Sequence, residues 1–345
     1  MLIRHDFYMF ARLFTLLLSL FSYAEYKVDL FYTSFIITDP CVESIVTSKA
    51  FQRLYGIAQY GIDPKVIPLR EHTKIYNRAN HSLGVYWLLN RYNVPTCEQL
   101  AGLLHDASHT VFSHVGDRVF NHKDGNYSYQ DMHHLTFLNE TDIPFNLKTH
   151  GFSLEDIDHK NPLFTCLEQN LPDICADRLE YNLAGGFLEN LLTIDDIFAI
   201  LDHLKFEDNR WYFTDSFYAQ KFARVSLWHT EHIWGAPMSS YVSEELADAI
   251  KKAVALGILT LEEIKHGTDD HVWKKLQECN NAEINNHLQT LYHAAEQHEV
   301  INKKPRNNKF RGINPWVKQG HEFKRLTEID AAFKQEYERV KENSY

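Results

Sequence analysis

An apolar helical stretch that runs directly into ionisable side chains constrains the fold of this chain more than any other feature. Residues 100–104 (Leu-Ala-Gly-Leu-Leu) repeat at helical spacing, and His105 and Asp106 follow at once. Burying two such groups costs several kcal/mol unless they are hydrogen-bonded or bind a metal ion. The segment therefore favours a helical core that ends in a binding site. His109, one helical turn after His105, is expected at the same site.

Hydrophobic periodicity predicts a mainly helical protein, and a content of 44% hydrophobic residues is enough for a large buried core. Minor strands are expected over residues 26–37, with a β-hairpin over residues 205–213. We therefore predict an all-α fold, a helical bundle with minor β-strands. Helices are expected around residues 42–58, 83–88, 96–106, 133–138, 176–183, 194–201, 216–234, 243–256, 261–264 and 284–298.

The chain divides into an N-terminal segment 1–24, a core 25–265 and a C-terminal helical appendage 266–345. In residues 1–24, two arginines precede the apolar run 13–21, a layout typical of a signal peptide; an upstream extension or a buried helix is the alternative. The run is shorter than the roughly 20 residues that span a bilayer, so we expect no integral membrane segment. A cytoplasmic location is predicted, with export as the alternative.

Composition excludes several classes of protein. The net charge of −11 argues against a general nucleic-acid coat protein, so no stable nucleic-acid partner is predicted. Five cysteines without a CxxC pair indicate neither a thiolate zinc site nor a disulfide framework. The basic residues 303–311 are read as a solvated loop, with an anion-contacting strand as the alternative.

Two further residues complete a candidate metal site. His81 opens another apolar helix, and Asp177 lies in a helical pattern suited to burial. With His105 and Asp106 they supply two imidazoles and two carboxylates, which suit an octahedral Mn, Fe, Mg or Ni ion, or Zn with water in open positions. Such an ion lowers the pKa of water and polarises a phosphoryl oxygen, as phosphoester hydrolysis requires.

The order of these four residues resembles the H…HD…D signature of HD-domain metal-dependent phosphohydrolases, in particular the deoxynucleoside triphosphate triphosphohydrolase branch. Residues 51–61 (FQRLYGIAQYG) look like its FQRLxxIxQxG segment, residues 77–85 (NRANHSLGV) like NRFEHSLGV, and residues 105–114 (HDASHTVFSH) like HDxxHxxFSH. The similarity covers about residues 39–181 and is weaker at residues 267–270 and 310–315.

The resemblance implies an HD-domain bundle and a role for each matching residue. Metal binding falls to His81, His105, Asp106 and Asp177. Arg78 is similar to an arginine that contacts phosphate or the leaving group, and His109 to a residue near the α-phosphate. A general acid corresponds to His133 or His134, with His134 favoured by spacing. The positions on the substrate side are Gln59, His114, Arg178 and Tyr181.

The chain departs from the family pattern in two places. Relatives continue the last motif as DYxxRD, whereas Ala184 and Gly185 stand here in place of the Arg-Asp pair. The general-acid histidine is not followed by glutamate. Both departures leave the nucleotide specificity open. Histidines without a motif, such as His159, are expected at the surface or in packing, and Trp234 is expected in the core.

Two classes of function follow. The leading hypothesis is a metal-dependent phosphohydrolase acting on a dNTP-like nucleotide or a related phosphate ester, releasing either tripolyphosphate or monophosphate. The alternative is a non-catalytic HD-domain protein that binds nucleotide or serves as a scaffold. The resemblance also implies a homo-oligomer.

Overall fold

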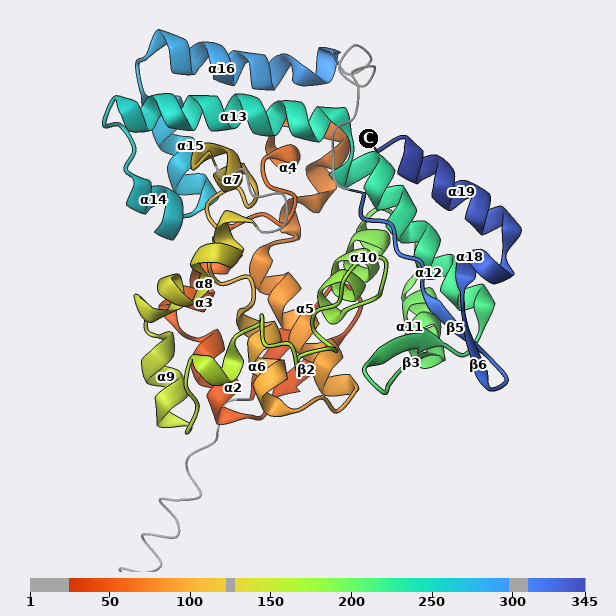
Figure 1. Ribbon diagram of the computed structural model, residues 1–345. Helices are drawn as coiled ribbons and strands as arrows, with labels where there is room; N and C mark the ends of the chain where they lie inside the picture. The colour runs from red at the N-terminus through yellow and green to blue at the C-terminus, as the bar shows by residue number, and fades with distance from the viewer. Residues whose placement is uncertain (1–24, 122–127, 298–309, 345) are drawn as a thin grey trace, which may run out of the picture.

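The computed structural model describes residues 25–121, 128–297 and 310–344, and it is mainly helical with small sheets, as predicted (Figure 1). The candidate signal peptide at residues 1–24 and most of the basic stretch, residues 303–309, lie outside the described residues. Within the described ranges, no helix combines the length and the apolar character needed to cross a bilayer.

Helices account for most of the described chain. The longer ones are α5 (Arg78–Arg91), α6 (Thr96–Leu104), α8 (Tyr129–Asn139), α10 (Ala176–Leu188), α11 (Ile194–His203), α12 (Ser216–His229), α13 (Pro237–Ala255), α15 (Asp269–Glu278), α16 (Ala282–His293) and α19 (Ala331–Glu342). The shorter ones are α2 (Pro40–Val46), α3 (Lys49–Gln52), α4 (Asp63–Val66), α7 (Val115–Val119), α9 (Ile143–Thr149), α14 (Leu261–His266) and α18 (Leu326–Ile329). Short segments of other helical types are η1 (Arg53–Gly56), η2 (Pro68–Ile75), η3 (Glu155–Ile157), η4 (Thr230–Trp234) and η5 (Ala294–Gln297).

Side-chain caps fix where several helices begin. Asn77 caps α5 by accepting a hydrogen bond from the Asn80 backbone N–H, which places His81 in the first turns of that helix. A capping box of Ser128 and Asp131 opens α8, because each side chain accepts from the other residue's backbone N–H. These local signals set the register of the helices that carry the candidate site.

The strands form two small sheets. β1 (Tyr26–Asp29) and β2 (Ser34–Ile37) pair antiparallel, as do β3 (Leu204–Glu207) and β4 (Arg210–Phe213), in agreement with the predicted hairpin. Two strands in the C-terminal part were not predicted: β5 (Trp316–Gln319) and β6 (Glu322–Arg325). β5 lies parallel to β4, so the C-terminal segment completes a four-stranded sheet.

Buried apolar side chains gather in two clusters. The larger cluster includes α5, α6, α10 and α12, and the smaller includes α4, α7 and α13 to α16. In Figure 1, α13 and α16 run side by side above the rest of the molecule. The segment that follows α6 joins the two clusters, because Ala107 belongs to the larger one and Phe112 to the smaller. The predicted core segment ends at residue 265. The smaller cluster contains residues from before and after that position.

Candidate metal centre

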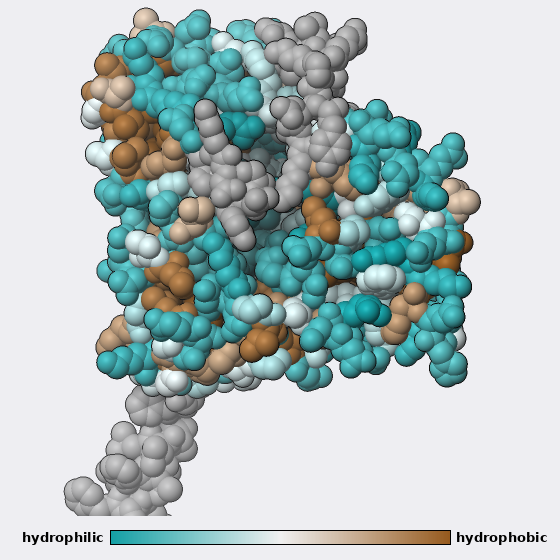
Figure 2. All heavy atoms as spheres, in the orientation of Figure 1, coloured by the Kyte–Doolittle hydropathy of each residue, from teal (hydrophilic) through white to brown (hydrophobic). Residues whose placement is uncertain are grey.

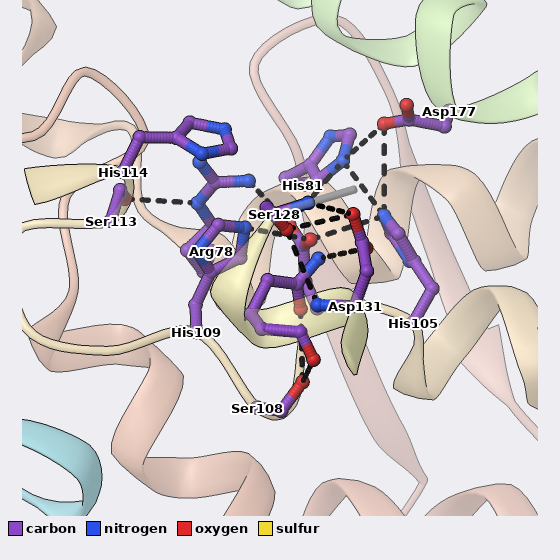
Figure 3. Close-up of polar contacts among 12 residues, drawn as sticks. Arg78, His81, His105, Ser108, His109, Ser113, His114, Ser128, Asp131 and Asp177 are labelled. Carbon is purple, nitrogen blue, oxygen red and sulfur yellow. Dashed lines mark hydrogen bonds and ion pairs between the residues drawn. The ribbon is translucent and has the colours of Figure 1, made fainter. Parts of the chain in front are cut away.

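The four predicted metal ligands converge from three segments of the chain. His81 lies on α5, His105 caps the C-terminus of α6 and precedes Asp106, and Asp177 lies in the first turn of α10. Figure 3 shows His81, His105 and Asp177 pointing toward one another. His81 Nε2 lies 3.2 Å from His105 Nε2, 3.0 Å from Asp177 Oδ1 and 3.6 Å from Asp106 Oδ2. Ligand atoms of His81, His105 and Asp106 all lie within 4.8 Å of one another.

Hydrogen bonds on the far side of each imidazole assign its tautomer. His105 Nδ1 lies 2.7 Å from the Gly102 carbonyl oxygen, and His81 Nδ1 contacts a carboxylate oxygen of Glu180. Both partners are acceptors, so each Nδ1 carries the proton and each Nε2 presents a lone pair. Two ring nitrogens that face each other at 3.2 Å beside two carboxylates need a positive charge between them, which is a proton in the ion-free protein or a bound metal ion. The donor set therefore fits a divalent metal ion.

Charges around the site keep Asp106 ionised. Burial alone would raise the pKa of the Asp106 carboxyl, but Arg78, His105 and His109 together hold that pKa well below its usual range. Arg78 Nη1 donates to Asp106 Oδ2 at 2.7 Å. Without an ion, burial lowers the pKa of His81, but contacts with Asp177 and Glu180 outweigh burial and raise it to about 10. The site thus attracts positive charge.

The loop after Asp106 holds Arg78 in place. Ser113 Oγ accepts from Arg78 Nε at 3.1 Å and donates to the Ala58 carbonyl at 2.7 Å. Phe112 and Ser113 both have φ near +55°, a region that costs a non-glycine residue on the order of 1 kcal/mol or more. The loop geometry therefore depends on its hydrogen bonds, which fix the guanidinium beside the metal ligands.

A cavity of about 890 Å³ opens beside the metal ligands. The face in Figure 2 is hollowed near its centre, where the surrounding side chains are largely hydrophilic. His105, Asp106 and Asp177 are among the residues that line this cavity. The predicted catalytic and substrate-side residues that also line it are Gln59, Arg78, His109, His114, Arg178 and Tyr181.

Two of the predicted residues, Arg178 and His134, make hydrogen-bond contacts with other parts of the protein. Arg178 donates through Nη1 and Nη2 to the backbone carbonyls of Asp173 and Gln169. His134 is buried, and its Nδ1 lies 2.8 Å from Ser108 Oγ. His133 is exposed, and its ring is tilted by 41° against that of Tyr129, with centroids 4.4 Å apart. His134 is therefore the inner histidine of the pair, although it is not among the residues that line the cavity.

His159 lies between His134 and the cavity. The two rings are perpendicular with centroids 4.5 Å apart, and His159 lines the cavity with 7% of its surface exposed. We expected His159 at the surface or in packing; it packs against His134 and also lines the cavity. No motif marks it, so only its spatial position reveals it. Glu180 was also missed, because its contact with His81 joins residues that are 99 positions apart.

The missing Arg-Asp pair has a structural counterpart. Gly185 packs so closely against α12 that a Cβ atom there would lie 2.8 Å from His229 Cε1 and 3.0 Å from Tyr60 Oη. A side chain at this position would have to displace both rings. The packing around position 185 therefore fits glycine and leaves no room for a larger side chain.

Comparisons with known proteins agree with this geometry. YdhJ of Bacillus subtilis, an uncharacterised protein, is 30% identical over 322 residues, which cover 89% of this chain and 94% of YdhJ. The metal-dependent phosphohydrolase cns2 of Cordyceps militaris is 26% identical over 269 residues, 76% of each chain. A segment of 96 residues, 24% of this chain, is 36% identical to 16% of the bovine deoxynucleoside triphosphate triphosphohydrolase SAMHD1.

A solved structure shares the fold across nearly the whole chain. It is a hypothetical protein from Aquifex aeolicus that superposes with a TM-score of 0.66 at 17% identity, covering 92% of this chain and 99% of its own. No family model matches the sequence. The ordered His81, His105-Asp106 and Asp177 set, its convergence and these relatives lead to one conclusion. The chain belongs to the same family as YdhJ, within the HD-domain metal-dependent phosphohydrolases.

Proposed function

We propose that the protein is a metal-dependent phosphohydrolase whose substrate is a nucleotide of the dNTP class. The observation that carries the proposal is the pair of imidazole nitrogens 3.2 Å apart, flanked by two carboxylates in the wall of a cavity. A divalent ion held by His81, His105, Asp106 and Asp177 would supply Lewis-acid polarisation of the phosphoryl group and a water of lowered pKa. The shared segment with SAMHD1 supports the nucleotide class.

Arg78 supplies fixed positive charge beside the reacting phosphate. Its Nε and Nη1 are engaged by Ser113 and Asp106, and the side chain lines the cavity. A guanidinium held in this way is oriented before substrate arrives, so it stabilises negative charge that develops in the transition state without reorganisation. Arg78 is thus assigned to phosphate binding and charge neutralisation.

His109 is assigned to the phosphate side as well. Its Nε2 lies 3.2 Å from Asp106 Oδ1, and its Nδ1 is buried without a hydrogen-bond partner among the described residues. Burial lowers the pKa of His109 to about 4, so the free protein holds this imidazole neutral near pH 7. His134 remains the assigned general acid. His159, whose ring contacts that of His134, lines the cavity itself. Gln59, His114, Arg178 and Tyr181 are assigned to substrate contact.

A hydrolysis panel on full-length protein tests the proposal. Phosphate and tripolyphosphate release from dNTPs and simple phosphomonoesters is measured with Mn²⁺, Mg²⁺, Fe²⁺ and Ni²⁺. We expect release that Asp106→Ala reduces by at least 100-fold, together with loss of bound metal. Asp270→Ala, which changes an exposed aspartate, is the matched control and should match wild type.

The product distinguishes the two hydrolytic reactions. Tripolyphosphate released from a dNTP indicates cleavage at the α-phosphate, and inorganic phosphate released from a phosphomonoester indicates a monophosphatase. If neither product forms with any of the metals and the protein still binds nucleotide, the protein is a non-catalytic binding protein.

A further inference from the structure

Arg53 lies behind the site and holds the loop that carries it. It is the first residue of η1, and it is not among the residues that line the cavity. Its Nη2 donates to the backbone carbonyl oxygens of Ala107 and His109, at 2.7 and 2.8 Å. Its Nη1 donates to the Gly267 carbonyl oxygen at 3.3 Å. One guanidinium therefore joins the loop that follows Asp106 to the turn between α14 and α15.

Arg53 forms no ion pair within the part of the chain that the structure describes. Its hydrogen-bond partners there are backbone carbonyl groups, and its Nε is buried without a partner. Burial lowers the pKa of Arg53 to about 10, which leaves the group charged at neutral pH. Burying a charge without an opposite charge costs free energy. The contacts of this guanidinium are therefore directed at the backbone of the loop.

The two carbonyl groups that share Nη2 lie on either side of Ser108. Fixing both of them sets the backbone path through Ser108 and the direction in which the His109 side chain leaves the loop. Ser108 Oγ lies 2.8 Å from Nδ1 of His134, the assigned general acid. His109 Nε2 lies 3.2 Å from Asp106 Oδ1. The same pair of hydrogen bonds thus holds residues on both sides of the proposed reaction.

The geometry suits arginine and does not suit lysine. A guanidinium presents five N–H donors in one rigid plane, and here that plane spans three carbonyl oxygens. Arg53 Cζ also lies 5.1 Å from the ring centroid of Phe137, a cation–π contact that orients the group. A lysine ammonium is a compact charge on a flexible stem, so it cannot reproduce this arrangement.

We infer that Arg53 is a positioning residue for the proposed reaction, because it fixes the loop so that the His109 imidazole meets bound phosphate in one orientation. Arg53 does not touch the substrate, and it acts through His109. Its role in catalysis rests on the proposed function, whereas its hold on the loop can be measured without any reaction.

Steady-state kinetics of full-length variants test the role in catalysis. Arg53→Met removes the three hydrogen bonds and keeps an apolar stem of similar length. Misplacing a group by 1 Å can cost on the order of 100-fold in rate, so kcat for dNTP hydrolysis with Mn²⁺ should fall about 10- to 100-fold. KM and the Mn²⁺ dissociation constant should stay within about 3-fold of wild type, because Arg53 contacts neither the cavity nor a metal-ligand side chain. Lys49→Met, which removes an exposed cation one helical turn earlier, is the matched control and should match wild type.

Two further variants separate positioning from a packing defect. Arg53→Lys keeps the charge and should fold with normal metal binding, yet it should still lower kcat because one ammonium cannot span the three carbonyl groups. In Arg53→Ala, guanidinium ion at millimolar concentration should restore part of kcat, because it can occupy the position that the side chain vacates. It should restore nothing when His109→Gln is added, since Arg53 acts through His109.

Histidine NMR measures the hold on the loop directly. The ¹H–¹³Cε1 signal of His109, assigned by its loss in His109→Gln, should shift or broaden in Arg53→Met, while that of the exposed His321 should not move. Wild-type kcat in Arg53→Lys, a fall in metal binding as large as the fall in kcat, or an unchanged His109 signal would overturn the inference. Absence of hydrolysis by the wild type, together with a shifted His109 signal in Arg53→Met, would overturn only the proposed function.

Discussion

At the scale of single residues, proton positions decide whether His81 and His105 can bind a cation. An imidazole ligates through a lone pair, and the hydrogen bond on its other nitrogen selects which atom carries that pair. The Gly102 carbonyl and the Glu180 carboxylate perform this selection from opposite sides of the site. Glu180 is itself fixed by Tyr76, whose hydroxyl donates to it at 2.5 Å. The ligands are therefore oriented before an ion arrives.

Another buried histidine, outside the metal site, makes the fold sensitive to acid. His229 is fully buried, its Nδ1 lies 2.9 Å from Asn182 Oδ1, and its Nε2 has no partner among the described residues. Burial lowers its pKa to about 3, from 6.5 in the unfolded chain. Between these values the unfolded state binds a proton that the folded state does not, so stability falls as the pH falls. The loss from this one group should reach about 3 kcal/mol at pH 4.

Urea unfolding from pH 4 to pH 8 checks this expectation. His229→Gln removes the titrating group, so the variant should lose less stability than wild type between pH 6.5 and pH 4. His321→Gln, at an exposed position, should keep the wild-type slope. If His229→Gln shows the same acid slope as wild type, His229 is not responsible.

Residue identity and order were enough to single out four residues that the structure brings together, because ligand types and their order are visible in the chain itself. Glu180 and His159 could not be found in this way. Their roles come from contacts across the fold, with His81 in one case and with His134 and the cavity in the other. No local pattern marks a carboxylate or an imidazole whose partner lies far along the chain.

At the scale of elements, the first residue of α15 holds the loop that carries the site. Asp269 accepts hydrogen bonds from the backbone N–H groups of Ala58 and Phe112, at 2.9 and 2.6 Å. Phe112 has positive φ, so this bond stabilises a strained conformation. Asp269→Ala leaves two buried donors unsatisfied, and we expect it to lower the free energy of unfolding by about 2–5 kcal/mol. Urea unfolding measures the loss, and metal analysis should show weaker binding in the variant.

The neighbouring Asp270 provides the control. Its side chain is 90% exposed and pairs with Lys65, so Asp270→Ala should change stability by less than about 1 kcal/mol. Equal stability of the two variants would show that Asp269 does not hold the loop.

Periodicity predicted the helices and the β3–β4 hairpin because those elements depend on neighbouring residues. It did not predict β5 and β6, since β5 becomes a strand by pairing with β4 about 100 residues earlier, a contact with no local signal. The π-turn η4 was also hidden. Its extra residue interrupts the 3.6-residue period. Trp234, at the end of this turn, packs against the larger cluster, as expected for a core residue, and also lines the cavity.

At the scale of the whole molecule, the site lies where two hydrophobic clusters meet. The loop of residues 105–114 passes from one cluster to the other. Residues of both clusters line the cavity, with Phe112 and Val115 from the smaller one and Tyr60 and Phe164 from the larger one. The ligands themselves come from α5, the end of α6 and α10. A bound ion therefore links segments that are distant in sequence.

This linkage predicts that metal stabilises the fold as a whole. An ion that binds only the folded state at 100 times its dissociation constant adds about 2.7 kcal/mol to the free energy of unfolding. For a chain of 345 residues that corresponds to a rise in Tm of about 4 °C. Calorimetric scans of protein stripped with EDTA, then supplied with metal, measure the rise. Because two of the four ligands are imidazoles, Ni²⁺ should raise Tm more than Mg²⁺ at equal concentration. Asp177→Ala should abolish most of the rise, and a rise as large as that of wild type would place the stabilising ion elsewhere.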